Sequence, residues 1–409
     1  MMQNSETIFR LERLKKKFMI SFEEDAEVFF FSPGRIELLG NHTDHNLGKV
    51  LVMTINLALL AAVKKNNSNF IRASFDQDDE FIVVDLEDTL PKKEESHQSI
   101  ALIRGVVSGM KNNGYDVSGF DIKIESAIPQ GAGISSSAAF ELVFCEVINQ
   151  LFNEGRISKL EKAIIAQKAE IDYFGKPCGL LDQVGISFGG INHIDFYTPH
   201  HPMITNLAAS LDEYSLILIN TPGSHANLTS YYSEIKSDMQ KVASYFGHDY
   251  LREGNESEFY RALPELLKVV GGRAILRSMH FFEENKRVDK ALIALQNQDI
   301  ELFLRLINES GQSSYDLLQN CYYPEDKEQG LSLAITITKK ILRRGAVRVH
   351  GGGFAGTILT IVHQDDANDY ISKMSSLFGA SNIYRVTPNF TGTTILDQPL
   401  ASLFFFGNT

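Results

Sequence analysis

The sequence is poor in cysteine and has no long apolar run. Its three cysteines, Cys145, Cys178 and Cys321, include no Cys-x-x-Cys pair. They therefore give neither a disulfide framework nor a zinc site, and they fit a reducing compartment. The longest apolar stretch, at 50–63, is too short to span a bilayer. The first 18 residues predict an amphipathic helix with charges throughout, unlike a secretory signal. We therefore expect a cytoplasmic protein with no membrane partner.

Long runs of one charge sign are also missing. The 39 basic and 51 acidic side chains leave a formal charge of -12, and no run of like charge exceeds three residues. A nucleic acid is therefore not expected as a partner. The sequence has no internal repeat and no low-complexity segment. With 409 residues, of which 44% are hydrophobic, the chain can bury a large core and is expected to form two or three domains.

Short apolar runs bounded by turn residues alternate with longer stretches of helical periodicity. These runs predict β-strands at 28–32, 81–86, 120–126, 215–220 and 357–362. A helical spacing joins five apolar residues: Ala139, Leu142, Val143, Val147 and Leu151. The alternation indicates an α/β or α+β fold. The loop-like stretch 197–214 is the expected boundary between two halves of nearly equal length.

The stretch IPQGAGISSSAAFELVF, at 128–144, predicts a phosphate cradle. A strand ends before it, two glycines follow a proline, and three serines open a helix. Unpaired N–H groups at a helix N-terminus bind anions, and glycines let an anion approach the main chain. A serine hydroxyl there can also reach a magnesium ion on the phosphates. The alternative is a glycine turn with an ordinary serine cap. The stretch is neither a P-loop nor a G-x-G-x-x-G fingerprint.

A second stretch, GRIELLGNHTDHNLGKV at 34–50, gathers two histidines, an aspartate and an arginine between glycines. Such side chains suit a polyol, because they accept from or donate to adjacent hydroxyls. A metal site at His42, Asp44 and His45 is the competing interpretation, but no further cluster of transition-metal ligands is evident. A third glycine cluster, at 347–362, precedes a strand and is typical of a tight turn as well.

Taken in order, these motifs resemble the GHMP family of small-molecule kinases, and most closely its galactokinase branch. SPGRIELLGNHTDHNLGKVL resembles the galactokinase signature, PQGAGISSSAA the ATP phosphate loop, and HGGGFAGTIL the third glycine motif. AEIDYFGKPCGLLDQVGISFGG, at 169–190, resembles the segment that carries the catalytic aspartate. The resemblance implies an α+β fold with an N-terminal domain of the ribosomal S5 domain 2 type at 1–205. It also implies a C-terminal domain with a ferredoxin-like core at 206–409, and an active site between the two.

The resemblance also implies roles for individual residues. Asp182 matches the catalytic aspartate and Arg35 its arginine, which suits phosphoryl transfer because a carboxylate orients the hydroxyl and an arginine stabilises negative charge. Glu170 matches the magnesium-binding glutamate, and Ser136 or Ser137 the serine ligand. The phosphates of ATP are expected at Gly131, Gly133, Ser135, Ser136 and Ser137. The sugar is expected at Asn41, His42, Asp44, Gly179 and Tyr232.

Asp182 and Arg35 could instead form a purely structural salt bridge, and Glu170 could be an ordinary exposed helical carboxylate. The chain also departs from the galactokinase pattern. Galactokinases carry glutamate at the position of Asn41, where it binds the sugar 6-hydroxyl, and tyrosine at the position of His45. The sequence HTDHN followed by MTIN is closer to plant galacturonokinases. An amide at position 41 could donate to a carboxylate at C6, which a glutamate would repel.

The expected function is an ATP- and magnesium-dependent kinase that phosphorylates the C1 hydroxyl of galactose. Galacturonate is the nearest alternative substrate and N-acetylgalactosamine a further one. A galactokinase-like regulator that binds sugar and ATP without turnover is an alternative of another class, and the complete set of Asp182, Arg35 and Glu170 argues against it. A decarboxylase of the mevalonate type would not be expected to carry the HTDH segment. The oligomeric state stays open, with a monomer favoured.

Overall fold

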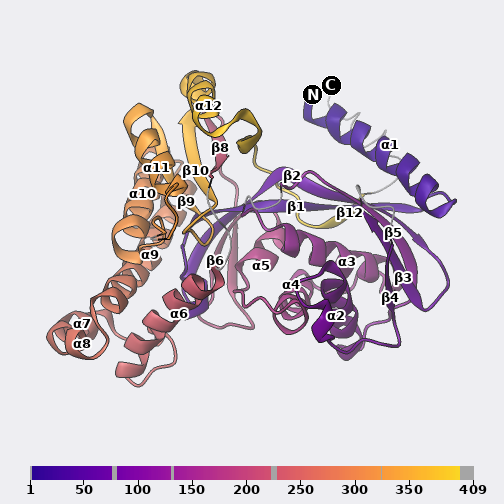
Figure 1. The fold of residues 1–409 in the computed structure, drawn as a ribbon, viewed down its shortest axis with the longest axis horizontal. Coiled ribbons are helices and arrows are strands. Elements are labelled where there is room, and N and C mark those ends of the chain that lie inside the picture. The colour runs from indigo at the N-terminus through magenta and orange to yellow at the C-terminus, as the bar shows by residue number, and fades with distance from the viewer. Residues whose placement is uncertain (1, 76–80, 130–132, 223–227, 324, 397–409) are drawn as a thin grey trace.

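The computed structural model describes residues 2–75, 81–129, 133–222, 228–323 and 325–396. The larger of two sheets has the strand order β12-β1-β2-β5-β3-β4, and β6 extends it by pairing with β2 and β7 (Figure 1). All its pairings are antiparallel except that of β3 with β5. The strands are β1 Val28–Leu39, β2 Lys49–Lys65, β3 Phe70–Phe75, β4 Ile82–Asp85, β5 Phe120–Ser126, β6 Ile191–Asp195, β7 Met203–Leu207 and β12 Thr394–Leu396.

Strand β1 is irregular where it carries polar residues. Its pairing with β2 shifts register between Pro33 and Arg35 and again between Glu37 and Leu39. An extra residue in one strand bends it and re-aims the neighbouring side chains. These two bulges bracket Arg35 and Glu37, which are buried although both are charged. The apolar stretch at 50–63 lies within β2, the longest strand of this sheet.

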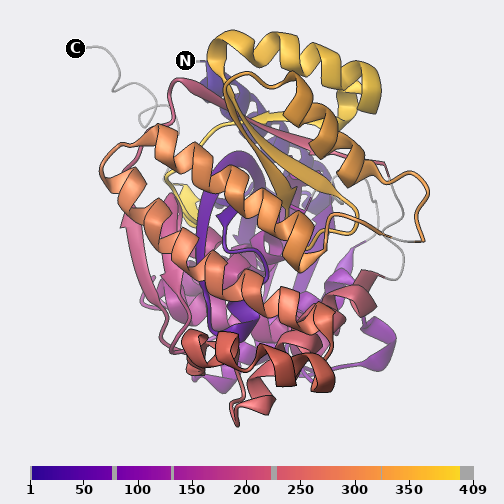
Figure 2. The same cartoon turned by 90° about the vertical axis from the view of Figure 1, so that its left-hand side faces the viewer.

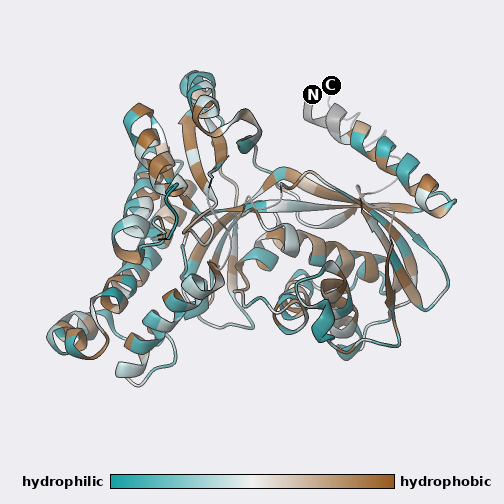
Figure 3. Ribbon diagram, in the orientation of Figure 1, coloured by the Kyte–Doolittle hydropathy of each residue, from teal (hydrophilic) through white to brown (hydrophobic). Residues whose placement is uncertain are grey.

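Helices cover both faces of the first sheet. One face carries α1, which buries Leu11, Leu14 and Phe18 against it, and Figure 3 shows hydrophilic and hydrophobic positions alternating along this helix. Below the other face in Figure 1 lie α2 to α5. These helices are α1 Met2–Phe22, α2 Ser99–Asn112, α3 Ser136–Phe152, α4 Lys159–Lys168 and α5 Leu181–Phe188, with a π-helical turn at Ala169–Phe174 and 3-10 turns at Asp44–Asn46 and Lys93–Glu95.

The second sheet has four antiparallel strands in the order β11-β8-β10-β9. Counted along the chain this is 4-1-3-2, with helices between the first and second strands and between the third and fourth. That is the βαββαβ arrangement of ferredoxin-like folds. The strands are β8 Tyr214–Asn220, β9 Gly345–His350, β10 Thr357–His363 and β11 Ile383–Val386.

Helices α11 and α12 cover one face of this sheet, whereas α9 and α10 lie side by side towards the first sheet (Figure 2). Alternate residues of β8 therefore face opposite sides of this sheet. Ile217 packs with α11 and α12, whereas Leu218 packs in the hydrophobic core shared with the first sheet. The helices of this half are α6 Leu228–Tyr245, α7 Glu256–Arg261, α8 Leu263–Val269, α9 Gly272–Gln296, α10 Ile300–Ser313, α11 Gly330–Ile341 and α12 Gln364–Phe378, with shorter turns at Leu251–Glu253, Ser314–Leu318 and Ala380–Asn382.

The structure confirms the α+β fold, the first helix and the five predicted strands. The prediction of a loop throughout 197–214 was wrong, because Met203–Leu207 forms β7 and pairs with β6. A strand from the end of the described chain, β12, joins the first sheet by pairing with β1. The domain limits 1–205 and 206–409 remain predictions. Within the described residues, no helix combines the length and apolarity that crossing a bilayer requires.

Candidate active site

Arg35 and Asp182 form an ion pair between the bulged strand β1 and the first turn of α5. Arg35 donates to Asp182 Oδ1 from Nε over 2.8 Å and from Nη2 over 2.6 Å. A third donor, Arg35 Nη1, lies 2.8 Å from the carbonyl oxygen of Gly133. The other carboxylate oxygen of Asp182 accepts a 2.5 Å hydrogen bond from Ser135 Oγ. The pair therefore contacts the predicted phosphate loop directly.

These contacts determine the charge of Asp182. Burial alone would raise the pKa of this carboxyl, but the charge of Arg35, the hydrogen bond from Ser135 and the charge of Lys176 outweigh it and bring the pKa below its ordinary value. Asp182 is therefore ionised at neutral pH. About a quarter of its side chain is exposed, compared with 7% for Arg35. A hydroxyl can thus reach this carboxylate from outside.

The predicted phosphate loop leads into α3, which begins at Ser136. Ser135, the residue before the helix, has a left-handed backbone with φ of 62° and no capping hydrogen bond. The serine-cap interpretation was therefore wrong for Ser135, because its hydroxyl turns to Asp182 instead. Ser136 lies exposed at the helix start. Gly133 precedes it with φ of 69°, while Gly131 lies outside the described residues.

Glu170 lies in the π-helical turn and is only 1% exposed, so its interpretation as an exposed helical carboxylate was wrong. Its Oε1 accepts hydrogen bonds from Ser137 Oγ over 2.9 Å and from Lys176 Nζ over 2.7 Å. Its Oε2 accepts one from Gln183 Nε2 over 2.8 Å. A hydroxyl and a carboxylate oxygen thus lie together at the start of α3. These are hard oxygen donors of the kind that Mg²⁺ prefers.

Asp44 and Gly179 lie against each other at the predicted sugar site. A Cβ on Gly179 would come within 1.7 Å of Asp44 Oδ2, so only glycine lets this carboxylate take its position. Burial and the nearby charges of Asp182 and Glu37 raise the pKa of Asp44 to about 7. The Asp44 carboxyl therefore lies near that of Asp182.

His42 and Tyr232 meet the glycine turn that joins β9 to β10. His42 Nε2 donates to the carbonyl oxygen of Gly352 over 2.9 Å, and the Tyr232 hydroxyl lies 3.3 Å from that of Gly353. A Cβ on Gly352 would come within 2.5 Å of the Tyr232 ring. The third glycine cluster thus forms a tight turn, which was its alternative interpretation. The turn also contacts two residues of the predicted sugar site.

Asn41 is buried in a hydrogen-bond network of the protein itself, with 1% of its surface exposed. Its Nδ2 donates to Glu37 Oε1 over 3.1 Å and to the carbonyl oxygen of Gly351 over 2.8 Å. Its Oδ1 accepts from Asn320 Nδ2 over 2.7 Å. Both amide hydrogens are therefore used, and the side chain has no donor left for a substrate.

The structure gives no support to a metal site at His42, Asp44 and His45. In the described parts of the chain, no group of three or more His, Cys, Asp or Glu side chains is arranged to hold a metal ion. Burial, together with nearby positive charges, lowers the pKa of His42 to about 4, although the hydrogen bond to the Gly352 carbonyl opposes this shift. His45 lies with its ring 5.6 Å from that of His42.

Sequence reasoning missed three residues of this candidate site. Lys176 pairs with Glu170, and Gln183 donates to both Glu170 and the buried Glu141. Burial, together with the charge of Glu170, raises the pKa of Glu141 well above its ordinary value. The position of Gln183 directly after Asp182 was a usable signal. Lys176 and Glu141 carry no such signal, because only the fold brings them beside Glu170.

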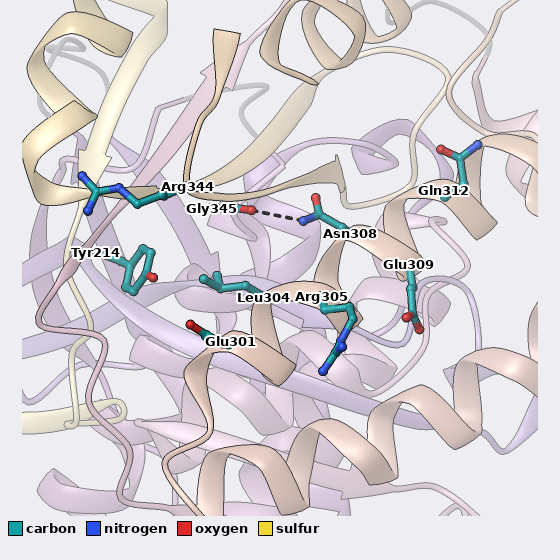
Figure 4. Close-up of a pocket in the computed structure, with 9 residues that line it drawn as sticks. All are labelled: Tyr214, Glu301, Leu304, Arg305, Asn308, Glu309, Gln312, Arg344 and Gly345. Carbon is teal, nitrogen blue, oxygen red and sulfur yellow. Dashed lines mark hydrogen bonds between the residues drawn. The ribbon is translucent and has the colours of Figure 1, made fainter. Parts of the chain in front are cut away.

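An open surface pocket lies elsewhere, between α10 and the start of β9 (Figure 4). Its Asn308 side chain donates to the carbonyl oxygen of Gly345 over 3.1 Å and so ties the helix to the strand. None of the predicted site residues lines it. The lining residues are Tyr214, Glu301, Leu304, Arg305, Asn308, Glu309, Gln312, Arg344 and Gly345.

Comparisons with known proteins find relatives over most of this chain. Residues 101–190 match the model of the GHMP kinases N terminal domain, and residues 16–65 match the galactokinase galactose-binding signature. The chain is 30% identical to a galactokinase of Clostridium tetani over 372 residues, which are 90% of this chain and 92% of the relative. It is 28% identical to a galactokinase of Clostridium beijerinckii over 396 residues, covering 94% and 97%.

Solved structures give the same grouping. The structure of Lactococcus lactis galactokinase complexed with galactose has a TM-score of 0.82 and 25% identity, and the match covers 94% of this chain and 100% of that one. The Methanococcus jannaschii mevalonate kinase has a TM-score of 0.63 at 14% identity, covering 89% and 98%. The second likeness shows the shared fold alone.

The raised pKa of Asp44 predicts a pH-dependent stability. Between its ordinary value of 3.8 and about 7, the folded protein retains a proton that the unfolded chain has released. Wild-type stability should therefore fall, relative to Asp44→Asn, as the pH rises from about 4 to about 7, and the difference should be constant above that. Melting temperatures of both proteins across this range test the prediction. The exposed Asp172→Asn serves as control, and parallel Asp44→Asn and wild-type profiles would contradict it.

The contact between Asn41 and Glu37 predicts a coupled pair of substitutions. Asn41→Glu sets one carboxylate against another and against the Gly351 carbonyl, so it should lower the free energy of unfolding by about 3 kcal/mol. Adding Glu37→Gln supplies a donor to the new carboxylate. The double variant should then be more stable than the sum of the single variants by about 2 kcal/mol. Urea denaturation of the four proteins measures this coupling, and additive effects would show that the two side chains do not interact.

Proposed function

Because the chain belongs to the galactokinase family of GHMP kinases, we propose that it transfers the γ-phosphoryl group of ATP to the C1 hydroxyl of galactose. The observation that carries this proposal is the ion pair of Arg35 and Asp182, which contacts the phosphate loop through Gly133 and Ser135. A purely structural salt bridge would not require the carboxylate to stay partly exposed beside a helix N-terminus.

The acceptor hydroxyl meets the carboxylate of Asp182. As an ionised group, Asp182 accepts a hydrogen bond from this hydroxyl and orients its oxygen towards the phosphorus. Arg35 holds the carboxylate in its charged form and supplies positive charge where the transferred group develops negative charge. Phosphoryl transfer needs mainly such positioning and charge compensation, which is what these two side chains provide.

ATP would lie with its phosphates at the N-terminus of α3. The unpaired N–H groups of the first turn favour an anion there. Ser137 and Glu170, whose oxygens are 2.9 Å apart, form a donor set that fits Mg²⁺. When bound, the ion would offset the negative charge of the β- and γ-phosphates. Lys176 keeps positive charge beside Glu170, and Gln183 holds its second oxygen in place.

Galactose would contact Asp44, His42 and Tyr232, with Gly179 leaving room beside the Asp44 carboxylate. Since His42 donates through Nε2 to Gly352, its other ring nitrogen, which has no partner among the described residues, can accept from a hydroxyl. The argument for galacturonate required Asn41 to donate to the C6 carboxylate. Both of its amide hydrogens are held by Glu37 and Gly351, so galactose is the substrate that these contacts favour.

A coupled assay of ADP release tests this function with ATP, Mg²⁺ and five acceptors: galactose, galacturonate, N-acetylgalactosamine, glucose and mevalonate. Turnover highest on galactose is the expected result. Preferred turnover on galacturonate would overturn the choice of sugar while leaving the kinase class. Sugar binding without turnover on any acceptor would overturn the enzyme and favour a sugar-responsive regulator.

Asp182→Asn should lower kcat on galactose by about 10³-fold, because the amide cannot take up the charge role of the carboxylate. The amide keeps the size of the side chain and its oxygen can still accept from Arg35, so the protein should fold, with a melting temperature lowered by the loss of the ion pair. Asp172→Asn, an exposed change in the neighbouring π-helical turn, is the matched control and should leave kcat unchanged. Near-normal turnover by Asp182→Asn in a folded protein would remove Asp182 as the catalytic carboxylate.

A further inference from the structure

His350 is the last residue of β9, and its imidazole lies at the junction of the two sheets. Its surface is 2% exposed. The backbone N–H of Glu37, on β1 of the first sheet, donates a 3.1 Å hydrogen bond to His350 Nε2. The residue roles described above make no use of this buried ring.

The hydrogen bond from Glu37 determines which ring nitrogen carries the proton. Burial, followed by the charges of Arg35 and Arg348, holds the pKa of His350 well below its ordinary value, so the ring is neutral at physiological pH. Nε2 accepts from a backbone N–H and therefore has no hydrogen of its own. In a neutral imidazole the proton is then on Nδ1, which becomes a hydrogen-bond donor.

This donor has no partner among the residues that the structure describes. A buried polar group without a partner is costly and needs an explanation such as a ligand. Among the described residues other than Gly133 and its chain neighbours, His350 Nδ1 is the only heavy atom within 4 Å of the position that a Cβ on Gly133 would take, at 3.6 Å. The carbonyl of Gly133 in turn accepts from Arg35. The free N–H thus lies over the phosphate loop, on the side of the catalytic arginine.

We propose that His350 donates its Nδ1–H to an oxygen of the phosphoryl group during its transfer from ATP to the sugar. The inference rests on the proposed kinase function and adds a catalytic residue to it. An anionic phosphate oxygen is a strong acceptor for such a donor. The histidine keeps its proton throughout, and the hydrogen bond offsets charge on the moving group together with Arg35.

The position of His350 indicates that its hydrogen bond goes to the phosphoryl group and not to the sugar. On the same glycine turn, Gly352 and Gly353 contact His42 and Tyr232, which belong to the sugar side. His350 instead faces Gly133, and a Cβ on the next residue, Gly351, would lie 3.8 Å from the carbonyl oxygen of Gly133. The turn therefore offers one end to each substrate.

Two substitutions separate the two hydrogen bonds of this ring. The amide of His350→Gln reaches the position of Nε2, where its oxygen can accept from Glu37, but it leaves no donor at Nδ1. The shorter amide of His350→Asn places an N–H near the position of Nδ1 and loses the contact with Glu37. A donor to the phosphoryl group is thus removed in the first variant and retained in the second.

Steady-state kinetics on galactose and ATP, with melting temperatures, test the proposal. His350→Gln should lower kcat by about 10²-fold with both KM values nearly unchanged, and should keep the melting temperature. His350→Asn should keep kcat within about a factor of ten while the melting temperature falls by several degrees. Wild-type kcat in His350→Gln would overturn the inference, as would kcat losses that follow the melting temperatures of the two variants.

A spectroscopic measurement on the wild-type protein tests the same inference without relying on the activity of the variants. The Nδ1–H signal of His350 in ¹⁵N-histidine-labelled protein, assigned through His350→Gln, is followed on adding Mg²⁺, ADP, aluminium fluoride and galactose. A marked shift is expected, and an unchanged signal would overturn the inference. If the wild-type protein shows no turnover on any acceptor, the kinase function fails by itself, and a shift with ATP and Mg²⁺ alone would still report a phosphate oxygen at Nδ1.

Discussion

The ion pair of Arg35 and Asp182 is the interaction on which the rest of the candidate active site depends. An ionised carboxylate is costly to bury, so it persists here because a guanidinium and a serine hydroxyl satisfy its oxygens. The guanidinium reaches Asp182 from a strand whose register shifts directly before Arg35. The same side chain holds the Gly133 carbonyl. One bulge in β1 therefore positions the guanidinium that joins Asp182 to Gly133.

Glu37 extends this arrangement to the second sheet. Its carboxylate accepts from Arg348 over 2.8 Å and from Asn41, while its backbone N–H donates to His350. Burial raises the pKa of Glu37, and the charge of Arg348 opposes this by favouring the ionised form. The contacts join β1 to β9 and to the glycine turn. Each sheet carries part of the candidate active site, and Glu37 joins the part on β1 to the part on β9.

Much of the fold and site could be predicted from sequence, because strands, glycine turns and helix starts have local signals. The pairing of Arg35 with Asp182 followed from the family motif, as did the meeting of Asp44 with Gly179. The hydrogen bond from Ser135 to Asp182 and the burial of Glu170 did not, since hydroxyl direction and burial depend on packing. Asn41 was misjudged for the same reason. Its partners Glu37, Gly351 and Asn320 come from three places in the chain, and the network that saturates its amide appears only in the fold.

The negative charges around Asp44 bear on which sugar the candidate site would bind. The carboxylates of Asp182 and Glu37 already disfavour the ionised form of Asp44, after burial itself. A further carboxylate at C6 would meet this negative field, and Asn41 has no free donor to offset it. A neutral hydroxyl meets no such penalty, because it can donate to one acceptor and accept from another. If the sugar binds as proposed, discrimination against its acid comes from the carboxylates of Asp182, Glu37 and Asp44 together, and position 41 does not have to supply it alone.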